Sequence, residues 1–140
     1  MVFMVQKEVA QRLTAVAGNR IYGALSAWVG NFAVPCYEFT VAPHVFRPRP
    51  KIDSAVVRLL PHPDPAWDQA RGLSWTLKLL FQQRRKQLGR ILKAQWSTDL
   101  EHWCAEWQVD RRVRPEELSP QALRTLSTIL APYFSCSQEV

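Results

Sequence analysis

The stretch Phe46-Arg-Pro-Arg-Pro-Lys-Ile-Asp-Ser-Ala-Val-Val-Arg58 joins a basic, proline-spaced loop to an apolar strand. Pro48 and Pro50 fix their own φ and push the residue before each of them out of the helical region. The spacing therefore predicts an extended loop over residues 46–51. Residues 54–60 are nearly all apolar and rich in β-branched side chains, which predicts a strand buried on both faces.

The loop also suggests a binding site, because it places an aromatic ring among cations. The side chains concerned are Phe46, Arg47, Arg49 and Lys51. A flat ring surrounded by cations suits an unstacked base and its phosphates. The alternative is a basic surface loop whose phenylalanine packs inward, and spacing alone favours that alternative because buried Phe is commoner.

Upstream of the loop, the periodicity predicts two helices and a strand. One helical stripe consists of Val2, Val5, Val9 and Leu13, and the turn at Gly18-Asn19 ends it. A second amphipathic helix is expected over residues 23–33, stopped by Pro35. The alternating residues of the following strand are Tyr37, Phe39 and Val41.

Downstream, the proline-rich segment Pro61-His-Pro-Asp-Pro65 predicts a linker between two domains, residues 1–63 and 64–140. The second domain is expected to be a small all-α domain. One long helix, or two end to end, is predicted over residues 73–93. Thr98 with Glu101 fits a capping box, and Ser119 followed by a proline fits an N-cap for a last helix that ends before Pro132.

The long predicted helix carries a cationic face. Seven basic residues and no acidic residue lie between Arg71 and Thr98. A helical wheel places outside the apolar sector Lys78, Arg85, Lys86, Arg90 and Lys93. Arg84 projects from the apolar sector and must pair with an acid or reach out of the core. We expect phosphate contacts from this face; the alternative is an ordinary solvated charged face.

Composition narrows the class of protein further. The formal net charge of +6 favours a polyanionic partner. Cys36, Cys104 and Cys136 are scattered without a CxxC pair or a histidine at ligand spacing, so we expect reduced thiols and no metal site. The first residues lack the features of a signal peptide, and no stretch reaches the ~18 apolar residues of a membrane span. A soluble, cytoplasmic protein is therefore expected.

Five segments together resemble the rRNA adenine dimethyltransferases of the KsgA/RsmA type, in the family's order and with similar gaps. They are the Phe46–Arg58 stretch, Gln6-Lys-Glu-Val-Ala-Gln-Arg-Leu13, Tyr22-Gly-Ala-Leu-Ser26, Phe81-Gln-Gln-Arg-Arg-Lys-Gln-Leu88 and Arg114-Pro-Glu-Glu-Leu-Ser119. The family's glycine-rich loop and its Asn-Leu-Pro-Tyr-type motif, which lie upstream of these segments, have no counterpart here. The chain therefore resembles the C-terminal half of such an enzyme.

The resemblance implies an α/β fragment, the last helices and strands of a Rossmann-like S-adenosylmethionine methyltransferase domain, followed by a helical RNA-binding domain. On this basis residues 1–63 are expected to be a cut piece of a parallel sheet. The family methylates adenine N6 in small-subunit rRNA, so rRNA or a pre-ribosomal particle is the implied partner. The resemblance places Phe46 beside the flipped adenine and assigns RNA contacts to the loop and helix cations. It also implies that most of the cofactor site is missing and that this chain alone is inactive.

Two other interpretations remain open from the sequence. The chain could be a stand-alone RNA-binding or ribosome-associated module without catalysis. It could instead be related to Erm-type large-subunit rRNA methyltransferases, which share the Phe-x-Pro-x-Pro loop. The basic stretch at Phe81–Leu88 and the segment Arg114–Ser119 favour the small-subunit type.

Overall fold

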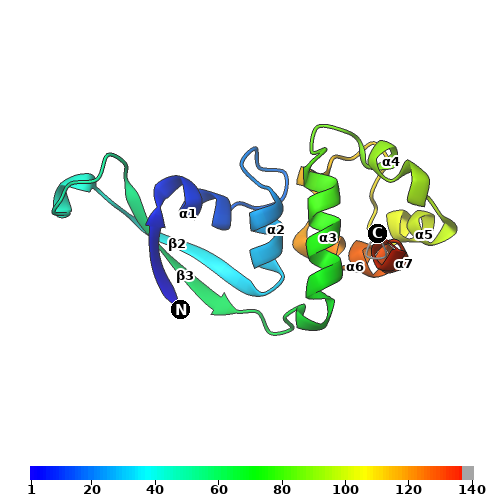
Figure 1. The fold of residues 1–140 in the computed structure, drawn as a ribbon, viewed down its shortest axis with the longest axis horizontal. Coiled ribbons are helices and arrows are strands. Elements are labelled where there is room, and N and C mark those ends of the chain that lie inside the picture. The colour runs from blue at the N-terminus through cyan, green and yellow to red at the C-terminus, as the bar shows by residue number, and fades with distance from the viewer. Residues whose placement is uncertain (137–140) are drawn as a thin grey trace.

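The computed structural model describes the backbone of residues 1–136 and the side chains of residues 1–134. Figure 1 shows two parts side by side, which we name the sheet part (residues 1–63) and the helical part (residues 64–136). The elements of the sheet part are β1 (Val2–Gln6), α1 (Lys7–Leu13), α2 (Ala24–Gly30), β2 (Ala33–Val41), a 3-10 turn (Pro43–Val45) and β3 (Ser54–Pro61). Those of the helical part are a 3-10 turn (Trp67–Gln69), α3 (Ala70–Phe81), α4 (Leu88–Ile91), a 3-10 turn (Lys93–Gln95), α5 (Thr98–Glu106), a 3-10 turn (Pro115–Glu117), α6 (Pro120–Ile129) and α7 (Ala131–Cys136).

The sheet has three strands in the order β1-β3-β2, and both pairings are antiparallel. The expectation of a parallel piece is therefore wrong, because the loop after β2 returns the chain directly beside it as β3. A bulge between Tyr37 and Phe39 shifts the register, so that Tyr37 pairs with Val57 and Phe39 with Val56. Val56 and Val57 are consecutive residues of β3 and therefore face opposite sides of the sheet. Their partners Phe39 and Tyr37 consequently lie on opposite faces as well.

The first helix is shorter than the apolar stripe predicted. Residues 2–6 form β1, whose register with β3 runs from Val2 opposite Arg58 to Gln6 opposite Ser54, and only residues 7–13 are helical. A short apolar run fits both periods, and strand pairing decided between them here. Strand β3 is confirmed, but it is buried on one face only: Ala55 and Val57 are buried, whereas Leu60 is 40% exposed.

The predicted helix over residues 73–93 is wrong in its middle. Helix α3 ends at Phe81, and the chain turns through residues 82–87 before α4. The first amides of α4 bond to a separate segment, since Leu88 donates to the Val113 carbonyl at 2.8 Å and Gly89 to the Arg111 carbonyl at 2.8 Å. A Cβ at residue 89 would lie 3.2 Å from the Arg111 carbonyl oxygen, so glycine permits this close approach.

Two of the three predicted helix ends are confirmed and one is wrong. Ser119 caps α6 as predicted, its Oγ accepting from the Ala122 amide at 3.2 Å. The cap of α5 is Ser97 rather than Thr98. Helix α6 ends at Ile129, before Pro132 as predicted, and a separate short helix, α7, follows with Pro132 in its first turn, where a missing amide costs little.

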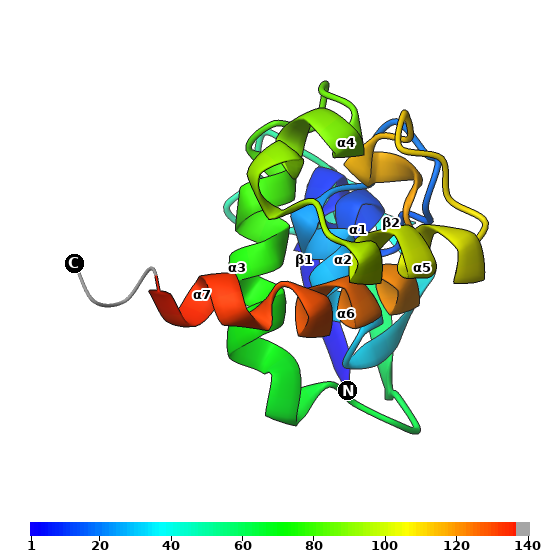
Figure 2. The same ribbon diagram turned by 90° about the vertical axis from the view of Figure 1, so that its right-hand side faces the viewer.

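The main core joins the two parts. Tyr22 and Ala27 from the sheet part belong to the same buried cluster as Leu73, Leu123 and Leu126. The Tyr22 hydroxyl donates to the Leu118 carbonyl at 2.9 Å. In Figure 2, α6 and α7 run across the upright α3, and Figure 1 places α2 next to it. The division at residue 63 remains a prediction about the chain, while the packing is continuous across it.

Candidate nucleic-acid interface

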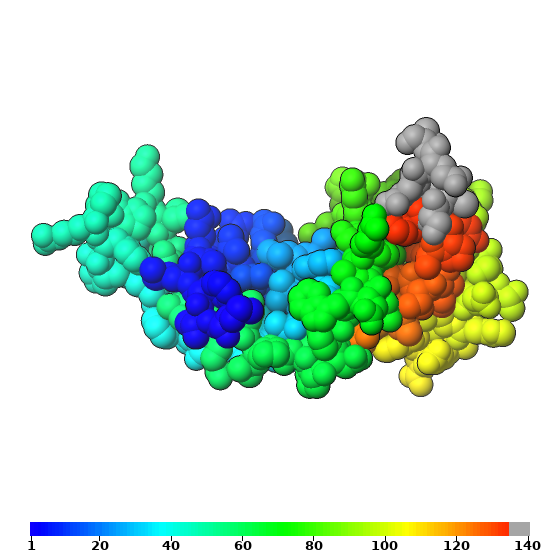
Figure 3. Space-filling view, turned by 60° about the horizontal axis from the view of Figure 1, so that its bottom comes forward, coloured from blue at the N-terminus to red at the C-terminus, as the bar shows by residue number. Residues whose placement is uncertain are grey.

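The loop between β2 and β3 projects from one end of the molecule (Figures 1 and 3). Phe46 is half-buried and belongs to neither buried apolar cluster, so its ring is not a core residue of either part. The same loop carries three cations, all exposed and without an ion pair to any described residue: Arg47, Arg49 and Lys51. The loop bends at residues 46–48 and 51–52 instead of being extended throughout as predicted.

The base of this loop is tied to the start of α1. The Lys7 amide donates to the Asp53 carbonyl at 3.0 Å, and Lys7 Nζ lies 3.2 Å from Asp53 Oδ2. The side chains of these two residues, with Gln6, Glu8, Gln11, Lys51 and Ile52, line a shallow hollow that we name the loop hollow. Sequence reasoning missed this contact, although both residues belong to quoted motifs.

The predicted cationic helix face is not one surface. Lys78 is exposed on α3 beside Trp75. Arg84, Arg85 and Lys86 lie instead in the non-helical turn after α3, which we name the basic turn. Lys93 begins a separate 3-10 turn, so the single-face prediction is wrong because the helix ends at Phe81. Arg85, Lys86 and Lys93 are nevertheless exposed.

Arg84 behaves as the sequence required, since it pairs with an acid. Its NH2 group lies 2.6 Å from Glu116 Oε2, its Nε donates to the same oxygen at 3.1 Å, and NH2 donates to the Arg20 carbonyl at 3.0 Å. This contact holds the basic turn against the loop that precedes α2. The guanidinium of Arg84 is therefore already bonded within the protein, unlike the side chains of its exposed neighbours Arg85 and Lys86.

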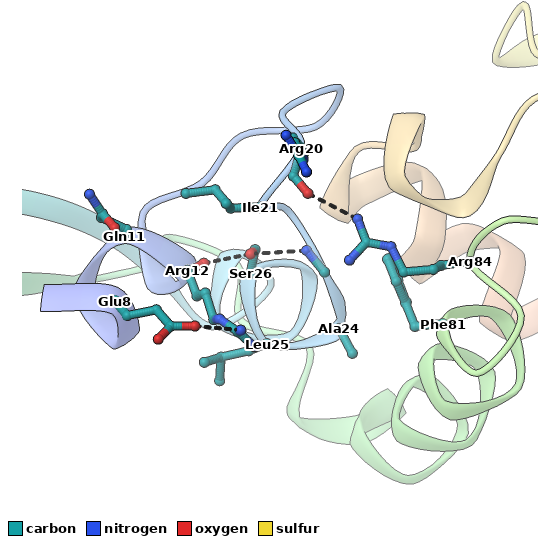
Figure 4. Close-up of a pocket in the computed structure, with 11 residues that line it drawn as sticks. Glu8, Gln11, Arg12, Arg20, Ile21, Ala24, Leu25, Ser26, Phe81 and Arg84 are labelled. Atoms are coloured by element: carbon teal, nitrogen blue, oxygen red, sulfur yellow. Dashed lines mark hydrogen bonds and ion pairs between the residues drawn. The ribbon is translucent and has the colours of Figure 1, made fainter. Parts of the chain in front are cut away.

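A second hollow lies between α1, the loop before α2 and the end of α3 (Figure 4), and we name it the arginine hollow. Arg12, Arg20 and Arg84 contribute its basic groups, and Glu8 its one acid. Arg12 pairs with Glu8 at 2.6 Å. Ser26 fixes the floor, because its Oγ accepts from the Gly23 amide at 3.2 Å and donates to the Arg12 carbonyl.

Arg12 and Arg20 were not predicted as site residues. The signal available was their proximity in sequence to two of the family-like segments, with Arg12 inside the first and Arg20 just before the second. Periodicity could not show that α1 and the loop before α2 face the end of α3 across one hollow.

The ionisable groups of the described residues do not indicate a nucleophile. Burial raises the pKa of the Cys104 thiol, which keeps it protonated and unreactive. Burial also raises the pKa of Tyr22, whose hydroxyl is already a donor to Leu118. A hydrogen bond from Arg58 to Glu38 at 2.6 Å raises the pKa of that guanidinium. Electrostatics here favours binding anions over acid–base chemistry.

Among residues 1–136 no group of three or more His, Cys, Asp or Glu side chains is placed to hold a metal ion. Cys36 and Cys104 are free and half-buried, and the side chain of Cys136 lies outside the described part. None of the helices within that range is long and apolar enough to cross a membrane.

S-adenosylmethionine does not fit the arginine hollow. Its sulfonium is a cation, and the arginine hollow surrounds a ligand with three guanidinium groups and a single carboxylate. The loop hollow is balanced in charge, because Lys7 and Lys51 lie there with Glu8 and Asp53. A cationic cofactor is disfavoured in the arginine hollow, whereas a phosphate-bearing ligand is favoured there.

Comparison with known proteins agrees with a methyltransferase fold. A crystal structure of a dimethyladenosine transferase from Plasmodium falciparum superposes with a TM-score of 0.69 at 22% identity, covering 96% of this chain and 57% of that one. The 23S rRNA methyltransferase ErmE gives a TM-score of 0.66 at 18% identity, over 93% of this chain and 54% of that one. At these identities the likeness shows the fold alone, that of rRNA methyltransferases.

Sequence comparison narrows the class. The family described as ribosomal RNA adenine dimethylase matches residues 1–131, and the chain belongs to this family. Ribosomal RNA small subunit methyltransferase A of Oleidesulfovibrio alaskensis is 48% identical over 130 residues, which are 92% of this chain and 46% of that protein. The protein of the same name from Nitratidesulfovibrio vulgaris is 47% identical over 130 residues, 92% of this chain and 49% of its own length. The chain thus spans about half the length of these relatives.

Proposed function

We propose that this chain is the RNA-binding half of an S-adenosylmethionine-dependent rRNA adenine N6-dimethyltransferase that acts on small-subunit rRNA or a pre-ribosomal particle. In this proposal residues 1–63 are the last helices and strands of a Rossmann-like methyltransferase domain. Residues 64–140 are its helical RNA-binding domain. The 45–48% identity to four small-subunit enzymes, over about half their length, supports the small-subunit substrate over the Erm type.

The observation that carries the proposal is the position of Phe46. Phe46 belongs to a projecting loop, lies outside both buried clusters, and shares the loop with three exposed cations. An enzyme that modifies a base must take it out of the stack and grip it on its faces. Phe46 supplies one wall for the flipped adenine, and Arg47, Arg49 and Lys51 contact the adjoining phosphates.

The remaining parts of the reaction belong to the portion of the relatives that this chain does not match. That portion holds the methyl donor and the opposite wall of the base pocket, since the arginine hollow disfavours a sulfonium. The helical part adds affinity for RNA through Lys78, Arg84, Arg85, Lys86 and Lys93. This chain alone therefore binds RNA and does not transfer methyl groups.

A binding experiment tests this role. The double variant Arg85→Ala/Lys86→Ala should bind rRNA more weakly, and the slope of log K against log salt should fall by roughly 1.4 to 1.8 for two lost phosphate contacts. The control Arg112→Ala/Arg114→Ala removes two exposed arginines from the segment between α5 and the 3-10 turn Pro115–Glu117, outside the basic turn itself, and should keep the full slope. If the first variant also keeps its slope, the basic turn is only solvated surface.

Addition of the missing portion separates the enzyme from a binding module. A fusion of this chain to the unmatched part of the Oleidesulfovibrio alaskensis protein should methylate adenine N6 in small ribosomal subunits. RNA binding without methylation by a folded fusion would instead identify a stand-alone binding module.

A further inference from the structure

The two hollows form one continuous track. The loop hollow and the arginine hollow share two lining residues, Glu8 and Gln11 of α1. One end of the track is Lys51, at the base of the Phe46 loop, and the other is Arg84, in the basic turn after α3. In Figure 1 the Phe46 loop, α1, the loop before α2 and the turn after α3 follow the same upper edge of the molecule. A nucleic-acid strand that contacts both the Phe46 loop and the basic turn would therefore cross this track.

Arg20, like Lys51 at the loop end of the track, is a cation that is free to take an anion. Arg12 is paired with Glu8 and Arg84 with Glu116, but Arg20 is exposed and forms no ion pair with any residue of the described part. Its own carbonyl accepts from Arg84, which fixes the backbone of the loop and leaves the guanidinium unrestrained. A planar guanidinium on a fixed backbone matches a phosphate group.

The walls beside Arg20 are apolar and open. Ile21 is 43% exposed and Leu25 is 42% exposed, and half-buried Phe81 adds a ring to the same hollow. Exposed apolar side chains next to a cation give a place for the face of a base beside a place for its phosphate. A duplex hides the faces of its bases in the stack, so such walls are of use only to a single strand.

We propose that this track binds a single-stranded segment of RNA between the Phe46 loop and the basic turn, with a phosphate on Arg20 and a base face on Ile21 and Leu25. The proposal rests on the proposed function, because it takes RNA to be the ligand. It adds a second nucleotide site, apart from the flipped adenine, and it assigns single-strand preference to the sheet part of the chain.

The test uses the complete chain and a fluorescein-labelled oligouridylate of about ten nucleotides, a length within the usual range for single-strand sites. Anisotropy should show that Arg20→Gln weakens binding about threefold or more and lowers the salt slope by roughly 0.7, as one lost phosphate contact on a single strand requires. Leu25→Ser should weaken binding without changing the salt slope. The matched control Arg112→Gln should bind like the unmodified chain.

A duplex of the same length provides the second comparison, and Arg20→Gln should affect it less than the single strand. The proposal is overturned if Arg20→Gln and Leu25→Ser bind like Arg112→Gln, or if the duplex loses as much affinity as the single strand. These outcomes leave the proposed function intact. Failure of the unmodified chain to bind any RNA would instead refute the proposed function. Both substituted side chains are exposed, and circular dichroism confirms that each variant is folded.

Discussion

The helical part and the sheet part differ sharply in how much apolar surface they bury. One cluster of 16 buried residues holds α3 to α6 together with α2, whereas the separate cluster under the sheet has three buried members, Ala10, Ala55 and Val57. The opposite face of the sheet is open. The strand register places on it Val2, Met4, Val34, Phe39 and Leu60, each at least 40% exposed.

The contrast shows that the apolar surface of the helical part is covered within this chain, whereas that of the sheet part is not. The helical part has a core in which leucines from several helices, such as Leu73 and Leu126, are fully buried. The sheet part presents an uncovered apolar face and a strand, β1, that pairs on one side only among the described residues. Such surfaces normally pack against further chain, and the relatives are about twice as long as this chain. We therefore expect the portion absent here to cover the open face.

The largest expected effect compares a core residue of the helical part with a residue on the open face of the sheet part. Leu126→Ala in the closed core should lower the free energy of unfolding by about 2–5 kcal/mol, the usual cost of such a cavity. Met4→Ala on the open face should cost less than about 0.5 kcal/mol, because Met4 is 55% exposed. Urea unfolding followed by circular dichroism measures both, at protein concentrations too low for association to be seen by light scattering. Equal costs would show that the open face is already covered, by association of copies.

The second prediction concerns that association. The chain alone should self-associate and melt at a lower temperature than its fusion to the unmatched part of a relative, since open edges and apolar faces invite pairing. Phe39→Lys, on the open face, should reduce the association seen by light scattering. The control Val16→Lys changes a residue that is 70% exposed away from the sheet and should have no effect. A monomeric chain with a sharp, concentration-independent melt would contradict this prediction.

The third prediction asks whether Phe46 acts on substrate or on packing. In the fusion enzyme, Phe46→Leu should lower methylation about tenfold, because base–aromatic stacking contributes about 1–3 kcal/mol and ~1.4 kcal/mol is a factor of ten. Phe46→Tyr and Phe46→Trp should retain much more activity. The melting temperature should barely change in any of the three variants. If stability and activity fall together, Phe46 is a packing residue and the assignment fails.

Much of the fold followed from local sequence. The second helix, both strands around the Phe46 loop, and the Ser119 cap were predicted because their periodicity and capping residues act locally. The errors arose where distant contacts decided. Residues 2–6 are a strand because β3 is beside them. The predicted helix is interrupted after Phe81, and the amides of Leu88 and Gly89 bond to the carbonyls of Val113 and Arg111 instead of to a preceding helical turn.

The exposure of the cations in the Phe46 loop and in the basic turn could be predicted from the sequence, but the arrangement of these residues could not. Arg84 was expected to need an acid, although Glu116 could not be named as its partner. The track through Arg20 depends on the approach of α1 to the end of α3, and a single sequence gives no measure of that approach.

The smallest effect expected lies at the joint between the two parts. Arg84 spans it, with Glu116 in the helical part and the Arg20 carbonyl in the sheet part. Arg84→Lys keeps the charge but loses the fork that reaches both acceptors. Because the two side chains are 41% and 25% exposed, we expect a loss of no more than about 1 kcal/mol in unfolding free energy. Binding of oligouridylate should weaken slightly as well, since the joint positions Arg20. Lys78→Gln, elsewhere on the surface of α3, is the control: it removes a charge without touching the joint, so its melting temperature should stay that of the unmodified chain. A melt of Arg84→Lys that is equally unchanged would show that the shared core alone, through Tyr22 and α2, holds the two parts together.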